Sequence, residues 1–278
     1  MSEHKMNIMQ IDVEPWYCGL DSSEWSSQED RVVENTIQVL NILKEFTAKA
    51  TFFVLGYVAE NHSCLVERIQ EEGHEIASHG YYHVPLTKQS PSEFEKDLVL
   101  SLNLLKKISA TAILGYRAPS FTVVDKTLWA IEILKKNGLK YDSSVFPVKT
   151  HLYGVPDAPR FPYHISSKNI KIDALGENFL EVPLSTYEIP LIGRNLPIAG
   201  GFYLRFFPYF FIKHAVRKIN KMDKPAVCYL HPWELDPKQP RVSQLSWYHY
   251  YRLSATKEKF RKLLKDFKFT SVKEYFQV

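Results

Sequence analysis

The sequence predicts an α/β protein built around a parallel sheet. Strand and helix signals alternate through the first two-thirds of the 278-residue chain. Residues 50–55 read ATFFVL, a short β-rich run of the kind found in strands that are buried on both faces. Such repeated strand–helix units form parallel sheets. A closed sheet would give a barrel and an open one a doubly wound fold, and periodicity alone does not choose between them.

Each element has its own local signal. A strand over residues 7–13 ends in acidic residues, and residues 31–46 carry the apolar stripe of a helix. The run Ser90-Pro91-Ser92-Glu93 starts a helix that continues to about residue 108, because serine can cap, proline suits the first turn and glutamate completes a capping box. The other expected elements are a helix at 64–72, a strand at 75–78, a strand at 114–116, a helix at 125–137, a strand at 139–142, a helix at 209–222, a strand at 226–230 and a helix at 256–267.

This rhythm is interrupted between about residues 146 and 208. Eight of the 16 prolines fall in that stretch, and few regular elements tolerate such a density. We therefore expect an insertion or loop layer there, with one strand near residues 179–182. We also expect this layer to help shape a substrate groove. No repeat or flexible linker is evident, so residues 1–278 are expected to form a single domain.

Composition excludes several classes of protein. The net charge is only +4, from 35 basic and 31 acidic residues spread along the chain, which argues against a nucleic-acid partner. No apolar run is long enough to cross a membrane, and no export signal is visible. The three cysteines match no zinc motif and favour a reducing compartment. We therefore expect a cytoplasmic protein, and the sequence says nothing about its oligomeric state.

Polar side chains follow the expected strands at the points where these end. They are Asp12 and Glu14 after the first strand, His79 and His83 after the third, and then Arg117, Asp142 and His231 at later strand ends. In parallel α/β folds the C-terminal ends of the strands form the active face. The sequence therefore predicts that these seven side chains gather on one rim.

The residue types on that rim suggest a catalytic metal site. His79 and His83 are four residues apart, so a helical turn would place both imidazoles on one side. Two histidines and one carboxylate leave open positions on a metal ion, as catalysis requires. Arg117 needs a carboxylate partner, and Asp12 is the obvious candidate. The alternatives are solvated acids and ordinary loop histidines, or a reactive thiol at Cys18.

Six runs of residues resemble the polysaccharide deacetylase family, whose catalytic region is called the NodB homology domain. They occur in the family's order, and the branch with an extra C-terminal segment linked to exopolysaccharide synthesis is the most similar. The runs are Ile11-Asp12-Val13-Glu14, residues 50–56, residues 73–83, Gly115-Tyr116-Arg117-Ala118-Pro119-Ser120-Phe121, Tyr141-Asp142-Ser143-Ser144 and Leu230-His231-Pro232-Trp233-Glu234.

The resemblance implies a distorted (β/α)7-type barrel that binds one divalent metal ion, usually zinc, with cobalt or nickel as alternatives. It implies that His79, His83 and Glu14 are the ligands. It further implies that Asp12 is the general base, that Arg117 holds it ionised, and that His231 is the general acid. Asp142 would orient or tune His231.

Two departures from the family pattern leave roles open. Many members have two adjacent aspartates where this chain has Asp12 and Glu14 separated by Val13, so ligand and base could be exchanged. The fourth motif is reduced to Asp142-Ser143-Ser144, which makes the role of Asp142 the least secure.

The expected activity is hydrolysis of an N-acetyl group from an amino sugar or glycan, with release of acetate. A backbone N–H near Ser143 or Tyr82 would assist in holding the oxyanion. The alternatives are an amidase of the same fold that acts on a small amide, a non-haem iron oxygenase, which the helical signals contradict, and a sugar-binding protein without catalysis.

Overall fold

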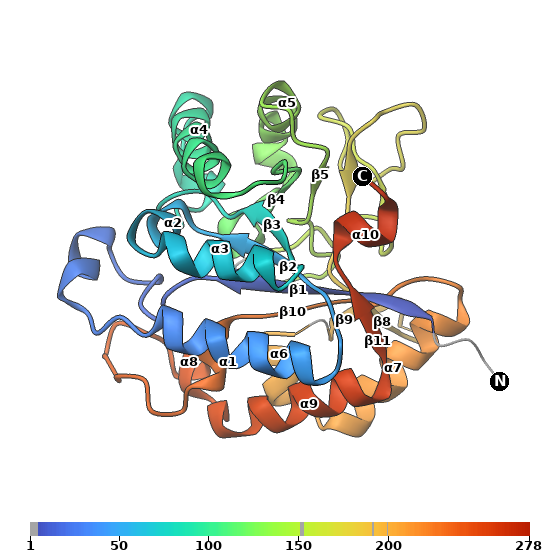
Figure 1. The fold of residues 1–278 in the computed structure, drawn as a ribbon. Helices are drawn as coiled ribbons and strands as arrows, with labels where there is room; N and C mark the ends of the chain where they lie inside the picture. The colour runs from blue at the N-terminus through green and yellow to red at the C-terminus, as the bar shows by residue number, and fades with distance from the viewer. Residues whose placement is uncertain (1–4, 151–152, 191, 199) are drawn as a thin grey trace.

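A curled sheet of mostly parallel strands runs through the centre of the molecule (Figure 1). The computed structural model describes residues 5–150, 153–190, 192–198 and 200–278. Neighbours in the order β10-β1-β2-β3-β4-β5-β7 are all parallel, while β6 is antiparallel to β7 and β11 pairs with β1. The strands of this sheet are β1 (Met6–Val13), β2 (Thr51–Val54), β3 (Glu75–Ser78), β4 (Gly115–Tyr116), β5 (Tyr141–Asp142), β6 (Tyr163–His164), β7 (Leu180–Glu181), β10 (Val227–Leu230) and β11 (Lys268–Thr270).

The segment after β7 bridges the gap between β7 and β10. Ser185 N donates a hydrogen bond of 3.2 Å to Val227 O, and Val227 N donates one of 2.7 Å to Ser185 Oγ. Gly200 forms a parallel bridge to Tyr229, where a Cβ atom would lie only 1.6 Å from the Tyr229 carbonyl oxygen. Only glycine allows the backbone so close. The expected distorted barrel of seven strands is therefore confirmed.

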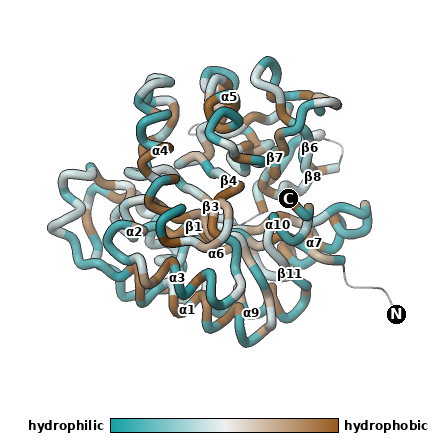
Figure 2. Tube along the Cα trace, turned by 45° about the horizontal axis from the view of Figure 1, so that its top comes forward, coloured by the Kyte–Doolittle hydropathy of each residue, from teal (hydrophilic) through white to brown (hydrophobic). Residues whose placement is uncertain are grey.

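Helices cover the outside of the barrel, with α4 and α5 on one side of β1 and α1 and α9 on the other (Figure 1). Hydrophobic and hydrophilic positions alternate along α1, α3 and α9 (Figure 2), because each helix buries one face. Among the described residues, no helix is both long and apolar enough to cross a membrane. The helices are α1 (Val32–Glu45), α2 (Gly56–Asn61), α3 (Ser63–Glu71), α4 (Pro91–Ile108), α5 (Trp129–Lys136), α6 (Phe202–Phe206), α7 (Tyr209–Lys221), α8 (Trp247–Tyr250), α9 (Thr256–Asp266) and α10 (Val272–Phe276).

Alternate residues of each strand point into the barrel. One buried apolar cluster fills its interior and includes Ile8, Phe53, Ala77, Tyr141, Val182 and Val227. Since side chains alternate between the two faces of a strand, residues two and four positions after Ile8 face inward as well. This parity brings Gln10 and Asp12 to the interior near the C-terminal ends of the strands.

The Pro-rich stretch contains more regular structure than we expected from its sequence. In its described part, β8 (Thr186–Ile189) and β9 (Arg194–Pro197) form an antiparallel hairpin outside the main sheet. Strands β6 and β7 and helix α6 also lie within it. Prolines are tolerated because they fall at the ends of these short elements, as Pro197 does at the end of β9.

Candidate active site

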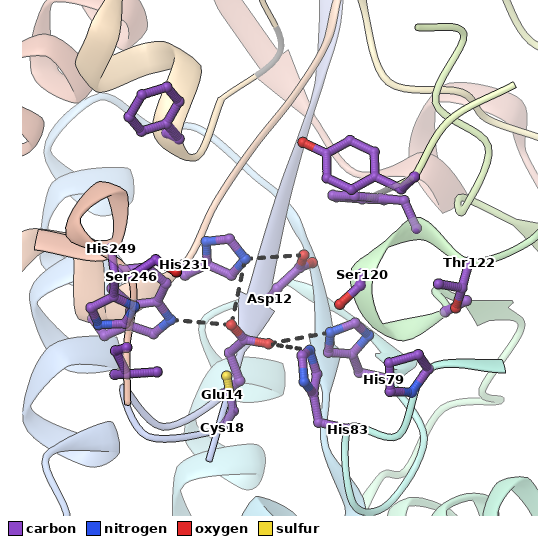
Figure 3. Close-up of a pocket in the computed structure, with 18 of the residues that line it drawn as sticks. Asp12, Glu14, Cys18, His79, His83, Ser120, Thr122, His231, Ser246 and His249 are labelled. Carbon is purple, nitrogen blue, oxygen red and sulfur yellow. Dashed lines mark hydrogen bonds and ion pairs between the residues drawn. The ribbon is translucent and has the colours of Figure 1, made fainter. Parts of the chain in front are cut away.

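Six of the seven predicted site residues line one pocket of about 530 Å³ at the C-terminal ends of the strands. They are Asp12, Glu14, His79, His83, Arg117 and His231. In the close-up, Asp12, Glu14, His79, His83 and His231 converge on one point (Figure 3). Each belongs to an inward-facing position in a strand or to the loop that directly follows it, which is the usual location of active sites in α/β barrels.

Glu14, His79 and His83 form the group of donors best suited to a metal ion. Their ligand atoms all lie within 4.8 Å of one another. Glu14 Oε2 is 2.9 Å from His83 Nε2 and 3.4 Å from His79 Nε2, yet this buried oxygen has no hydrogen bond of good geometry. A buried carboxylate oxygen facing two imidazole nitrogens fits a tetrahedral divalent ion with one position left for water or substrate.

Neighbouring groups hold these donors in place. His79 Nδ1 lies 2.8 Å from the Arg117 carbonyl oxygen, which fixes the ring and leaves Nε2 free to bind a metal. Trp233 Nε1 donates a hydrogen bond of 3.1 Å to Glu14 Oε1. Burial alone would raise the pKa of Glu14, but His83 and His231 outweigh it and hold that pKa well below its ordinary value. The carboxylate is therefore ionised, as a ligand must be.

The loop between the two histidines is not helical, so this part of our sequence interpretation was wrong. Gly80 and His83 both have left-handed backbone angles, with φ of 76° and 57°. Asp97 accepts hydrogen bonds from the backbone N–H groups of Tyr81 and Tyr82, at 2.8 and 3.3 Å. A Cβ at position 80 would lie 2.8 Å from an Asp97 oxygen. A tight loop held by Asp97 therefore brings the imidazoles together.

Asp12 belongs to a buried polar network centred on Arg117. Arg117 Nη1 donates to Asp12 Oδ1 at 2.6 Å, and its Nε donates to the Ser143 carbonyl oxygen at 2.9 Å. Nη2 donates to Ser143 Oγ at 2.9 Å and also contacts Gln10. Arg117 lies over the Phe53 ring, 4.4 Å from its centroid. This arrangement leaves Asp12 Oδ2 directed toward His231 Nε2, at 3.8 Å.

His231 is oriented by Glu234, a residue that our sequence interpretation did not assign to the site. His231 Nδ1 donates to Glu234 Oε1 at 2.8 Å, and Arg205 Nε donates to Glu234 Oε2 at 2.7 Å. Burial disfavours the charged imidazole, but the carboxylates of Glu14 and Glu234 overcome this and raise the pKa of His231 to about 9. Its Nε2, 3.5 Å from Glu14 Oε1, is therefore placed to supply a proton.

Asp142 is the predicted site residue that the structure does not bring into the pocket. Tyr141 and Ser143 point into the barrel, so Asp142 between them faces the outer layer. Ser144 Oγ donates to Asp142 Oδ1 at 2.5 Å, and the carboxyl group of Glu181 is its other partner. Asp142 is thus not in contact with His231, and Glu234 occupies the position beside Nδ1.

Other groups considered from the sequence are less suited to catalysis. Cys18 lines the pocket, but burial and then Glu14 raise the pKa of its thiol well above the ordinary value, so it stays protonated. The backbone N–H groups of Ser143 and Tyr82 already donate to Tyr116 O and to Asp97, so neither is free to hold an oxyanion. The expectation of an oxyanion donor near these residues stays a prediction, and it does not concern these two N–H groups themselves.

The fold and the site define a class: α/β-barrel proteins with two histidines and one carboxylate at the strand ends, a set of donors that could hold a metal ion. Residues 23–141 match the family model of polysaccharide deacetylases, and residues 143–277 match a domain of unknown function, DUF3473. The chain thus contains a polysaccharide deacetylase domain, which is followed by a C-terminal DUF3473 extension.

Curated relatives match a limited part of this chain. A peptidoglycan-N-acetylglucosamine deacetylase of Bacillus cereus is 35% identical over 101 residues, which is 36% of this chain and 37% of that protein. A peptidoglycan deacetylase of Helicobacter pylori is 32% identical over 108 residues, or 39% and 36% of the two chains. The matches thus span little more than a third of either relative.

Solved structures confirm the fold over the whole chain. A protein from Mycobacterium smegmatis classed with the polysaccharide deacetylases has a TM-score of 0.63 at 19% identity, covering 100% of this chain and 92% of that one. A pseudoenzyme of family CE4 from Bacillus anthracis has a TM-score of 0.51 at 14% identity, covering 99% and 66%. At such identities the similarity concerns architecture, so activity has to be argued from the site.

Proposed function

We propose that this protein is a metal-dependent N-deacetylase that hydrolyses the N-acetyl group of an amino sugar within a glycan. The observation that carries the proposal is that Glu14, His79 and His83 converge in the same pocket as Asp12 and His231. A hydrolase of this type needs a metal site, a base and an acid around one reacting carbon, and the pocket offers a group for each.

The residues divide the work according to their neighbours. A divalent ion held by Glu14, His79 and His83 would polarise the amide carbonyl and make water more acidic. Asp12, held by Arg117 at 2.6 Å, accepts the proton of the attacking water. His231, held by Glu234, gives a proton to the departing nitrogen as the C–N bond breaks. The products are acetate and a free amino sugar.

The geometry also supports one of the two possible assignments of the acids. Glu14 Oε2 faces both histidines, whereas Asp12 Oδ1 is bound by Arg117 and its Oδ2 faces His231. Glu14 is therefore proposed as the ligand and Asp12 as the base. Two histidines and one carboxylate form a known ligand set of catalytic zinc, so zinc is the ion proposed here.

Acetate release tests the activity. The purified protein is incubated with N-acetylated glycans, nucleotide-linked N-acetyl sugars and small cyclic amides, before and after chelation, and then with zinc or cobalt restored. We expect acetate from a glycan, its loss on chelation and its recovery with metal. Full activity in verified metal-free protein would contradict the metal assignment. Hydrolysis of small amides alone would identify an amidase instead, and sugar binding without acetate release would identify a non-catalytic protein.

A further inference from the structure

A cluster of partly exposed aromatic rings adjoins the pocket on the side of His231. It consists of Phe202 and Phe206 of α6, Trp247 and Tyr248 of α8, and Tyr251; we call it the aromatic platform. The ring centroid of Phe202 lies 5.9 Å from that of Trp247, 6.1 Å from that of Tyr248 and 5.8 Å from that of Tyr251. Trp247 is 67% exposed, Phe206 46% and Tyr248 41%. Single exposed aromatics are common, but contiguous ones mark binding surfaces.

The platform is continuous with the candidate active site. Phe202 and Tyr248 both line the pocket that contains Asp12 and His231, and Trp247 extends the same ring cluster away from it. Ser246 and His249, which flank this segment, lie on the His231 side of the pocket (Figure 3). A long ligand whose reacting group sits between Asp12 and His231 would therefore reach the platform directly.

Two cations, the buried Arg205 and the half-buried Lys259, hold the platform in a fixed shape. Arg205, 2% exposed, donates from Nη1 to the carbonyl oxygens of Tyr248, His249 and Tyr251 at 3.1, 2.9 and 2.7 Å. Lys259 Nζ donates to three carbonyl oxygens of the α6 segment at 3.0, 2.8 and 2.7 Å. The Arg205 contacts tie α6 to α8, and the Lys259 contacts tie α9 to α6. A preorganised surface loses little conformational entropy when a ligand binds.

The chemistry of the platform matches a neutral sugar chain. Among the described residues, no ring stacks in parallel on Trp247, which stands at 86° to Phe202 and 88° to Tyr251. The cations beneath are engaged, because Arg205 binds Glu234 and Lys259 binds carbonyl groups. The exposed Arg252 lies over the Tyr251 ring, 5.9 Å from its centroid. Attraction to anionic lipid headgroups takes a cluster of basic side chains, which a single exposed arginine beside Tyr251 does not form. Flat apolar rings beside hydroxyl groups suit sugar rings, which have apolar faces and polar edges.

We propose that the aromatic platform binds the sugar residues that adjoin the one hydrolysed in the pocket, so that the substrate is an oligosaccharide or polymer. All five rings lie within residues 143–277, which assigns a glycan-binding role to the C-terminal extension. The proposal rests on the proposed deacetylase function for the position of the reacting sugar, but the binding of sugar to the platform does not require hydrolysis.

Affinity as a function of chain length tests this. β-1,4-linked N-acetylglucosamine oligosaccharides of one, two, four and six units are titrated by calorimetry into the metal-loaded protein. We expect the affinity to rise from the dimer to the hexamer. Trp247→Ala and Phe206→Ala should each lower hexamer affinity roughly 3- to 10-fold, which is the loss expected for one aromatic contact. Phe210→Ala is the matched control, because Phe210 is 74% exposed but lies on α7, outside the platform.

Three results would overturn the platform proposal. These are the absence of oligosaccharide binding, equal affinity for all lengths, and a length effect that survives both substitutions. Vesicles of neutral and anionic phospholipid form a further arm, and vesicle binding lost in the same variants would identify a membrane surface instead. Length-dependent binding without acetate release would contradict the deacetylase function but leave the platform proposal standing. Acetate release that depends on neither length nor Trp247 would contradict the platform alone.

Discussion

Glu234 lies 2.8 Å from His231 Nδ1, three residues further along the chain. The intervening Pro232 starts a short 3-10 turn, Pro232–Leu235, and Glu234 Oε1 also accepts a hydrogen bond of 3.1 Å from His231 N. The carboxylate thus fixes both the backbone and the ring of the histidine. Arg205 binds its other oxygen, which keeps it ionised although both side chains are buried.

Glu234→Gln should therefore lower kcat by roughly 10-fold or more, up to the ~10²–10⁴-fold contribution of a general acid. The amide keeps the shape but removes the charge that favours the imidazolium. In a His231→Ala background the same substitution should have little further effect, because the two residues act as a unit. Acetate release is measured for the four proteins, with thermal unfolding as a folding control. Additive losses would show that Glu234 does not act through His231.

The sequence could predict most of the site because strand ends can be located from periodicity. Asp12, Glu14, His79, Arg117 and His231 each occupy an inward position in a strand or directly after it, and that position follows from the two-residue repeat. The same alternation explains why Asp142 lies outside the pocket. It follows the inward Tyr141 by one residue, so it faces the outer layer, which its position at a strand end alone does not reveal.

The sequence does carry a signal for the contact between Glu234 and His231, namely the spacing of a capping box. The run Ser90-Pro91-Ser92-Glu93 correctly predicted the capping box at the start of α4. His231-Pro232-Trp233-Glu234 has the same spacing of proline and glutamate, and its glutamate also bonds back to the first residue. The aromatic platform could not be found in this way, since it depends on contacts between α6 and α8, which are far apart in the sequence.

Metal content should separate the roles of the two acids. Glu14→Ala removes an oxygen that faces both histidines, so we expect it to lose most bound zinc, and excess zinc to restore part of the activity. Asp12→Asn should retain the ion and lose roughly 2 or more orders of magnitude in rate. Elemental analysis beside kcat measures both effects, and Asp142→Asn serves as a carboxylate control outside the pocket. If Asp12→Asn loses the ion while Glu14→Ala keeps it, the assignment is reversed.

Arg117→Met should lower the free energy of unfolding as well as the activity. Arg117 and Asp12 are both buried, and removal of one partner leaves an uncompensated charge, which typically costs about 3–5 kcal/mol. Urea unfolding measures the change in free energy. Asp12→Asn combined with Arg117→Met should be less destabilising than the sum of the single changes, because neither charge is then left alone. Strict additivity would indicate that the pair is not coupled.

The last prediction concerns pH and the buried carboxyl pair between β5 and β7. Burial raises the pKa of Asp142 to about 6 and that of Glu181 well above its ordinary value. Because the two carboxyl groups are neighbours, ionising both at once is costly as well. Both groups have ordinary values near 4 in an unfolded chain. The folded state therefore holds protons more tightly than the unfolded state. The pair therefore stabilises the fold fully below pH ~4, and this contribution is lost as the pH rises through the pKa values of the folded state.

Glu181→Gln should remove most of this pH dependence. The amide can donate to Asp142 as a protonated carboxyl group does, while its oxygen still accepts from Val145 N, as Glu181 Oε1 does at 2.9 Å. Melting temperatures between pH 4 and 8 compare the variant with the native protein and with Glu188→Gln, whose carboxylate is exposed. We expect the native protein to lose stability relative to Glu181→Gln as the pH rises above 6. Parallel melting curves across this range would show that the pair ionises without cost to the fold.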